Sequence, residues 1–122
     1  MDESWEQLRA DAVSALDTLI NAMDDARDDL EASQTAFERN RDHLRSGGQA
    51  TAMTELFDIP ALRSTLTDRL AHIEQARMAS RRALWRMQIA EGTTITDVAR
   101  SWGLSRQLVS RALSSDDQKH SD

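Results

Sequence analysis

The stretch from residue 4 to about residue 45 contains neither glycine nor proline. Along it, apolar or long side chains recur at alternating steps of three and four residues, at Trp5, Leu8, Ala12, Leu16, Leu19 or Ile20, Met23, Arg27, Leu30, Gln34, Phe37, Arg41 and Leu44. This spacing lines the side chains along one side of an α-helix, and its seven-residue period is typical of a helix that packs on another helix. We therefore expect one long helix over residues 4–45, with a seam that Arg27, Gln34 and Arg41 leave only partly apolar.

A second long helix is expected over residues 61–91. The first helix ends at Ser46-Gly47-Gly48-Gln49, and we expect a short helical turn at residues 53–59 within the loop of residues 46–60. Pro60 suits the first turn of the helix that follows. The same rhythm then runs without a breaker as far as Gly92, through Leu62, Leu66, Leu70, Ile73, Arg77, Ser80, Leu84, Met87 and Glu91.

Two long helices joined by a short connection are expected to pair antiparallel. Charge suggests a register for this pair. It sets Glu38 near Asp68 and Arg69, and Asp42 near Arg63. It also sets the acidic block Asp24, Asp25, Asp28 and Asp29 beside Arg77, Arg81 and Arg82. The alternative is that both charged sets are solvated faces, since exposed ion pairs each contribute only about 0 to 1 kcal/mol.

Residues 94–113 have the pattern of two short amphipathic helices with Gly103 at the corner. Thr94 and Ser105 are suitable N-caps for the first and second helix, with Asp97 completing a capping-box-like pair. The inward positions are Ile95, Val98, Ala99 and Trp102 on the first helix, and Leu104, Leu108 or Val109, and Ala112 or Leu113 on the second. The expected fold is all-α: a long antiparallel, coiled-coil-like hairpin of residues 1–91 that continues into a helix-turn-helix of residues 83–113, with a flexible tail at 114–122.

The second short helix leaves four polar side chains facing outward, namely Arg106, Gln107, Ser110 and Arg111. Arginine pairs with guanine and glutamine with adenine along the edges of the major groove, so these four are the candidate base-reading residues. Candidate phosphate contacts are Arg81, Arg82, Arg86, Arg100 and Ser105. A polar outer face is also the ordinary state of any surface helix, which is the competing interpretation.

A motif runs from Ile95 through Val98-Ala99 to Trp102-Gly103-Leu104-Ser105 and is followed by Arg106 to Val109. This motif resembles the trihelical DNA-binding domain at the C-terminus of serine resolvases and invertases. More loosely, it resembles many bacterial repressors. The resemblance covers approximately residues 83–113 and implies that Gln107 and Arg111 turn toward base edges. The glycine-rich arm that precedes this domain in recombinases is missing, and nothing upstream is similar to their catalytic domain. The resemblance therefore implies DNA binding and not strand exchange.

The net charge of -6 is unusual for a DNA-binding protein, because phosphate attracts basic surfaces. Its distribution is uneven. Residues 1–60 carry 14 acidic and 5 basic side chains, whereas residues 61–122 carry 7 acidic and 10 basic ones. Because the field that DNA meets is local, a basic end on an acidic molecule remains compatible with DNA binding.

No residue set points to catalysis, a metal or a cofactor. Cysteine is absent, and the histidines His43, His72 and His120 have no partners at metal-ligand spacing. The carboxylate run from Asp24 to Glu31 lacks the glycine turn of a calcium loop and lies in a predicted helix. Met78, Trp85 and Met87 could line a ligand pocket, but core packing is the favoured role. We expect a protein that is not an enzyme.

The expected cell context is cytoplasmic, in association with the nucleoid. The acidic N-terminus does not resemble a signal peptide, and no apolar stretch approaches the roughly 18 residues of a membrane span. We expect a homodimer that binds double-stranded DNA, as a transcription regulator or an architectural protein, since two-fold dimers read two half-sites. The alternative is a coiled-coil adaptor or antitoxin-like protein whose acidic N-terminal helix binds a protein partner.

Overall fold

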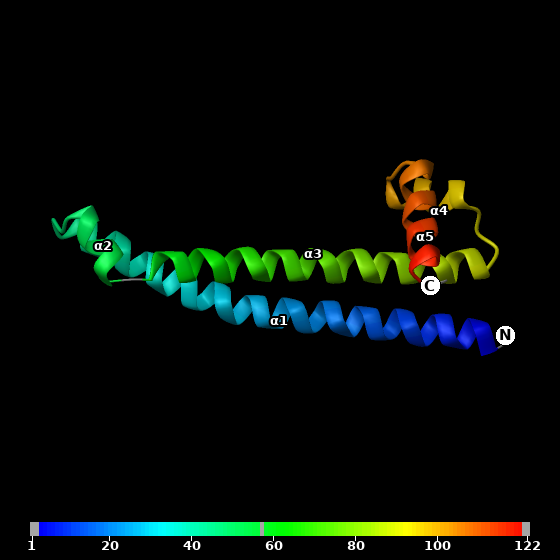
Figure 1. Cartoon of the computed structure of the whole chain (residues 1–122), viewed down its shortest axis with the longest axis horizontal. Coiled ribbons are helices and arrows are strands. Elements are labelled where there is room, and N and C mark those ends of the chain that lie inside the picture. Colours follow the sequence, from blue (N-terminus) through cyan, green and yellow to red (C-terminus); the bar gives the residue numbers. More distant parts are fainter. Residues whose placement is uncertain (1–2, 57, 121–122) are drawn as a thin grey trace. The chain divides into compact units, whose positions relative to one another are not determined.

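The computed structural model describes residues 3–56 and 58–120, and every regular element in these residues is an α-helix (Figure 1). The helices are α1 (Glu3–Arg45), α2 (Ala50–Leu56), α3 (Ile59–Ala90), α4 (Ile95–Trp102) and α5 (Arg106–His120). The predicted all-α fold is confirmed. The chain divides into a hairpin unit, Leu19–Gln75, and a terminal unit made of Met1–Thr18 with Ala76–Asp122. Both α1 and α3 contribute residues to each unit.

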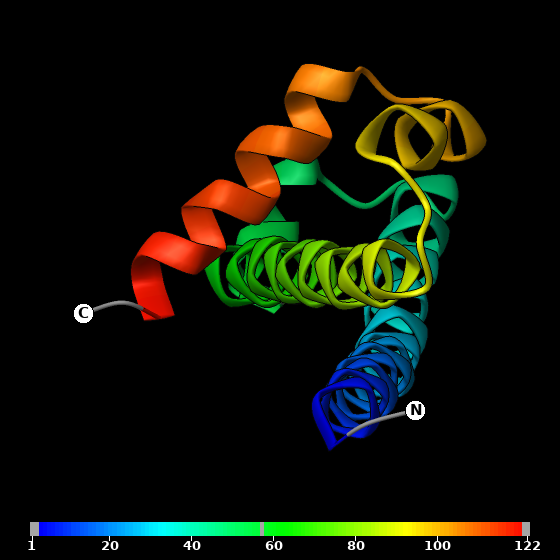
Figure 2. The same ribbon diagram turned by 90° about the vertical axis from the view of Figure 1, so that its right-hand side faces the viewer.

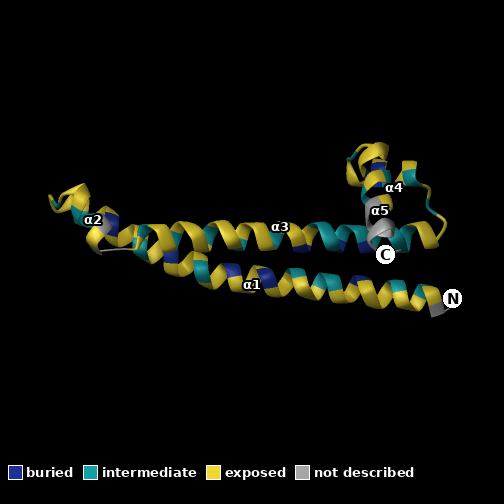
Figure 3. Ribbon diagram, viewed as in Figure 1, coloured by how far each residue is buried: buried dark blue, intermediate teal, exposed yellow. Residues whose placement is uncertain are grey.

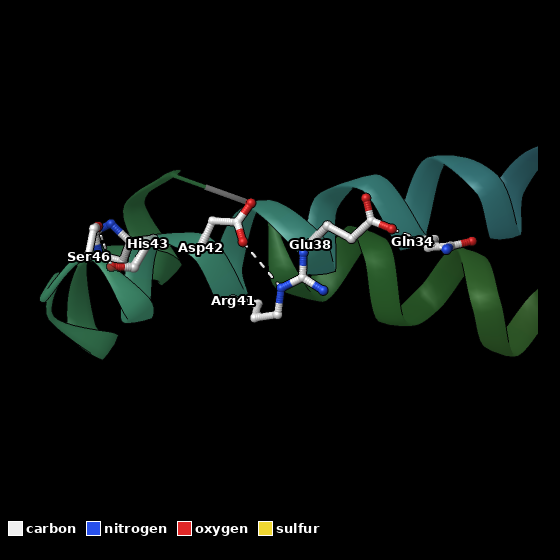
Figure 4. Close-up of polar contacts among 6 residues, drawn as sticks. All are labelled: Gln34, Glu38, Arg41, Asp42, His43 and Ser46. Atoms are coloured by element: carbon white, nitrogen blue, oxygen red, sulfur yellow. Dashed lines mark hydrogen bonds and ion pairs between the residues drawn. The ribbon is translucent and has the colours of Figure 1, made fainter.

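Two glycines directly after α1, Gly47 and Gly48, end this helix, as predicted from the sequence. Gly47 has a φ of 90°, a conformation that favours glycine, and the Gly48 N–H donates to the His43 carbonyl at 2.9 Å. The Ser46 hydroxyl donates to the same carbonyl at 2.9 Å (Figure 4). A side chain at position 48 would meet the His43 imidazole, which would have to shift to make room for it.

The connection between the long helices contains α2, which begins earlier than the short turn predicted at residues 53–59. The following helix, α3, begins as expected around Pro60. The Asp58 carboxylate accepts a hydrogen bond from the Ala61 N–H at 3.1 Å, which caps the first turn. Proline is tolerated in that turn because its missing N–H would have no helical partner.

In the hairpin unit, α1 presents small or polar side chains to α3. This inner stripe, all buried or half-buried, consists of Ala22, Ala26, Asp29, Ser33, Ala36, Asn40 and His43. Ala26 shares a groove with Ile73, and Ser33 shares grooves with Leu62 and Leu66, so the stripe faces α3. Figure 3 shows that buried positions recur at intervals along α1. Small side chains allow two helix backbones to approach closely.

The predicted seam lies beside this inner stripe and is exposed throughout the hairpin unit. We call this part of it the outer seam: Ile20, Met23, Arg27, Leu30, Gln34, Phe37, Arg41 and Leu44. Its apolar members Ile20, Met23, Leu30, Phe37 and Leu44 are 53, 46, 50, 50 and 47% exposed. Leu70 of α3, also placed in the predicted packing rhythm, is 61% exposed. The seam was expected to pack on another helix; in the hairpin unit the smaller side chains next to it are the more buried ones, and the outer seam stays exposed.

The register of the hairpin also differs from the predicted one. Arg69 donates a hydrogen bond to Asp29 and lies 3.9 Å from the Asp25 carboxylate, whereas Glu38 was expected beside it. The shift is about two and a half helical turns. The hydrogen bond from Arg69 to Asp29, together with the charges of the nearby carboxylates, raises the pKa of Arg69 above its ordinary value. Asp42, expected near Arg63, pairs with its neighbour Arg41 at 3.2 Å (Figure 4).

The terminal unit has a core built from the last part of α3 with α4 and α5. Trp85, Val98 and Val109 are fully buried and Ala99 nearly so, and around them pack Ile95, Leu104, Ala112 and Leu113. Trp85 is therefore a core residue, as favoured from the sequence. Of the alternatives left open, Val109 and not Leu108 points inward, since Leu108 is 37% exposed.

The last helix is longer than expected. The sequence predicts an end at Leu113 and a flexible tail over residues 114–122, but α5 continues to His120. The segment after Leu113 contains no glycine or proline, so nothing in it breaks the helix. The last two residues of the predicted tail lie outside the described part of the chain.

Candidate nucleic-acid interface

The corner between α4 and α5 is fixed by local hydrogen bonds. The Thr94 hydroxyl accepts from the Asp97 N–H at 3.1 Å, and the Ser105 hydroxyl accepts from the Leu108 N–H at 3.1 Å. Both predicted N-caps are confirmed. Gly103 ends α4 in the left-handed conformation, with φ 68° and ψ 31°, and its N–H points to the carbonyls of Ala99 and Arg100. The direction in which α5 leaves the corner is thus set by the sequence around it (Figure 2).

The core of the terminal unit fixes which side of α5 is turned to solvent. Val109 is fully buried, and Ala112 and Leu113 pack against the same core. Of the four candidate base-reading residues, Arg106, Gln107 and Arg111 are exposed and Ser110 is half-buried. Since residues three and four apart share a helix face, Gln107 and Arg111 lie side by side on α5 with Ser110 next to them. The structure therefore brings the four together on one helix, with three of them open to solvent.

The five candidate phosphate contacts differ in availability. Arg100 has a side chain that is 78% exposed and lies 3.6 Å from Asp97, a pair on the surface of α4. Ser105 is exposed, and its hydroxyl already caps α5. A hydroxyl that accepts a backbone hydrogen bond can still donate its own proton, so the cap does not remove Ser105 from contact with a phosphate.

The three arginines of α3 are less open. Arg81, Arg82 and Arg86 are all half-buried. The Arg81 guanidinium lies 5.0 Å from the centre of the Trp85 ring, a cation–π contact that ties it to the core. Arg81 therefore has a structural role that the sequence did not reveal, and Arg100 is the most accessible of the four candidate arginines.

A hydrogen bond between α3 and α4 was also missed. The Trp102 indole N–H donates to the Gln88 side-chain oxygen at 3.1 Å, and the Trp102 ring remains 39% exposed. Trp102 was expected to point inward, and it does so only in part. Its amphipathic ring explains this, because one edge can contact the core while the N–H reaches a polar partner at the surface. No periodicity connects Gln88 with Trp102, so the sequence carried no signal for this pair.

The segment of the chain that forms this interface is rich in basic residues. Between residues 77 and 111 the chain has seven arginines and only two acidic residues, Glu91 and Asp97. Guanidinium groups are suited to phosphate and to the guanine edge, because each presents several donors in a planar fork.

The part of the chain that the structure describes contains no cluster of three or more acidic or histidine side chains that could hold a metal ion.

No helix in the described residues is both long enough and apolar enough to cross a membrane. Comparison of the chain with protein-family models, with curated proteins and with solved structures found no match. The geometry of the site is therefore the basis for a functional assignment.

Proposed function

We propose that this protein binds double-stranded DNA in a sequence-specific manner and that α5 enters the major groove. The observation that carries the proposal is the two-sidedness of α5: Val109 is fully buried, while Arg106, Gln107 and Arg111 are exposed. These side chains match the groove chemistry, because arginine donates to guanine and glutamine exchanges two hydrogen bonds with adenine. Ser110 serves a base or a phosphate at the edge of the contact.

The beginning of α5 also suits DNA. The first backbone N–H groups of a helix attract anions, and Arg106 stands at that end of α5. Arg100, at the exposed surface of α4, would contact the phosphate backbone next to the groove. The half-buried Arg82 and Arg86 would add further phosphate contacts.

A dimer fits this mode of binding. One recognition helix reads only a few base pairs, whereas a two-fold dimer reads two half-sites about 34 Å apart. We infer that the chain acts as a homodimer, in the role of a transcription regulator or an architectural protein on the nucleoid. The DNA face is basic even though the whole chain is acidic, and this restricts DNA binding to that face.

The experiment is selection of duplexes from a random pool by the purified full-length chain, followed by affinity measurements on the selected duplex and on a scrambled one. We expect selected sequences with a short two-fold repeat and at least about a thousandfold preference over the scrambled duplex. The matched control is Arg39→Ala, which removes an exposed arginine of the hairpin unit and should leave affinity unchanged. Enrichment of no sequence, with equal affinity for both duplexes, would rule out specific recognition.

A further inference from the structure

The outer seam of the hairpin unit is an exposed surface with coiled-coil spacing. Its eight positions alternate in steps of three and four, and all eight are exposed. The inner stripe repeats with the same rhythm and faces α3. A helix with two adjacent seven-residue seams packs against two neighbouring helices, and in the hairpin unit α3 occupies only one of these sides.

The neighbouring side of α3 extends the exposed surface. One groove between the helices is lined by Met23, Leu30 and Gln34 of α1 and by Ile73 of α3, and the next by Leu30, Phe37 and Leu66. Leu70, 61% exposed, lies on α3 between Leu66 and Ile73. The result is a two-helix apolar face with grooves along its middle, into which side chains of another helix pair can insert.

The polar positions of the outer seam indicate what covers this face. Arg27, Gln34 and Arg41 occupy one heptad position, and the acidic Asp24, Glu31 and Glu38 occupy the adjacent flanking position. The three polar seam residues have local partners on the surface of α1: Arg27 lies 3.5 Å from Asp24, Gln34 donates to Glu38 at 3.1 Å, and Arg41 lies 3.2 Å from Asp42 (Figure 4). Exposed pairs of this kind contribute little to stability.

Two copies of α1 placed antiparallel about a two-fold axis would satisfy this pattern. The arrangement sets Arg27 against Glu38 of the second copy, Gln34 near the axis against Glu31, and Arg41 against Asp24. Apolar side chains fall opposite the aliphatic stems of the polar ones, which is a common way to cover such stems. A parallel arrangement would instead set Arg27 against Arg27 and Arg41 against Arg41, and like charges facing each other destabilise a helix pair.

We propose that the outer seam, with Leu66, Leu70 and Ile73, is the interface for a second copy of this chain, and that the two hairpin units form an antiparallel four-helix bundle with Gln34 near its two-fold axis. The proposal specifies the homodimer included in the proposed function. It depends on the hairpin unit and not on DNA binding.

Crosslinking tests the arrangement directly, because the chain has no native cysteine. The full-length double variant Met23→Cys/Arg41→Cys should form disulfide-linked dimers on mild oxidation, since residue 23 of one copy lies against residue 41 of the other. The two positions are about 27 Å apart along their own helix and cannot join within one chain. The single variant Arg41→Cys should remain monomeric on a denaturing gel. Dimers from the single variant would show parallel pairing and overturn the proposal.

The oligomeric state provides the second readout. Light scattering of the wild-type chain should give twice the monomer mass, and Leu30→Glu/Phe37→Glu should halve it while helicity by circular dichroism is retained. The matched control is Asn21→Glu/Thr35→Glu, which adds the same two negative charges at exposed positions of α1 outside the seam and should leave the dimer intact. A monomeric wild type, or a dimer that survives the double substitution, would contradict the proposal.

These measurements use no DNA. A dimer that binds no duplex would overturn DNA binding and leave the interface standing, and a monomer that binds a specific duplex would overturn the interface and the homodimer and leave DNA recognition by α5 standing.

Discussion

The rings of Trp85 and Trp102 meet edge to face, with centroids 5.7 Å apart and an interplanar angle of 87°. This contact joins α3 to α4, and it is supported by the hydrogen bond from Trp102 to Gln88. Edge-to-face aromatic pairs contribute about 0.5–1.5 kcal/mol beyond the area they bury. The position of α4, and through the Gly103 corner that of α5, therefore depends on Trp85.

Replacement of Trp85 should be the most damaging change in the terminal unit. Trp85→Ala removes a fully buried indole and should lower the free energy of unfolding by about 3–5 kcal/mol, as measured by urea denaturation. Trp85→Phe should cost less, because the Trp85 N–H donates no hydrogen bond within the described residues. A loss below about 1 kcal/mol for the alanine variant would show that this core is not what holds the unit together.

Gly103→Ala should destabilise the corner through backbone conformation alone. A Cβ at this position would meet no atom within 4 Å, but the left-handed conformation at φ 68° costs an alanine about 1–2 kcal/mol. Gly103→Asn should cost less, since asparagine tolerates that conformation better. Equal stability of the alanine variant and the wild type, in the same denaturation assay, would count against a fixed corner.

Ser105 combines a cap with a candidate phosphate contact, and two substitutions separate these roles. Ser105→Ala removes the cap of α5 and should lower stability by about 0.5–2 kcal/mol. Ser105→Asp keeps a capping oxygen but adds a negative charge that phosphate repels. The aspartate variant should unfold like the wild type and bind DNA more weakly. Unchanged DNA affinity of the aspartate variant would remove Ser105 from the interface.

Arg100 and Arg81 should respond differently to alanine substitution. Arg100→Ala should lower the affinity of the protein for the specific and the scrambled duplex alike. It should also reduce the slope of log affinity against log salt concentration by about one unit. Arg81→Ala should instead lower the free energy of unfolding by about 0.5–2 kcal/mol, because it removes the cation–π contact with Trp85. An unchanged salt slope for Arg100→Ala would show that this residue touches no phosphate.

The local features of the candidate interface could be predicted from the sequence. The caps at Thr94 and Ser105 and the corner at Gly103 each depend on one or two neighbouring residues, and the structure has all three. The Trp102 to Gln88 hydrogen bond could not be predicted, because it joins residues on different helices without a shared period.

The packing of the hairpin unit shows why periodicity alone is insufficient. Two adjacent sides of α1 carry a seven-residue rhythm, and the rhythm alone does not show which of them is buried in the hairpin unit. Which side packs on α3 depends on how closely the helix backbones approach, and this favours residues such as Ala22 and Ala26. The register failed for a related reason: several charge pairings were consistent with the sequence, and only the structure shows Arg69 beside Asp29.

The central claim, base reading by α5, is tested most directly by measuring the affinity of Gln107→Ala and Arg111→Ala for the selected duplex and for a scrambled duplex of the same length. Each substitution should cost about 1–3 kcal/mol on the selected duplex and leave binding to the scrambled duplex nearly unchanged, because a base contact carries sequence information and a phosphate contact does not. Equal losses on both duplexes, or no loss on either, would contradict base recognition by this helix.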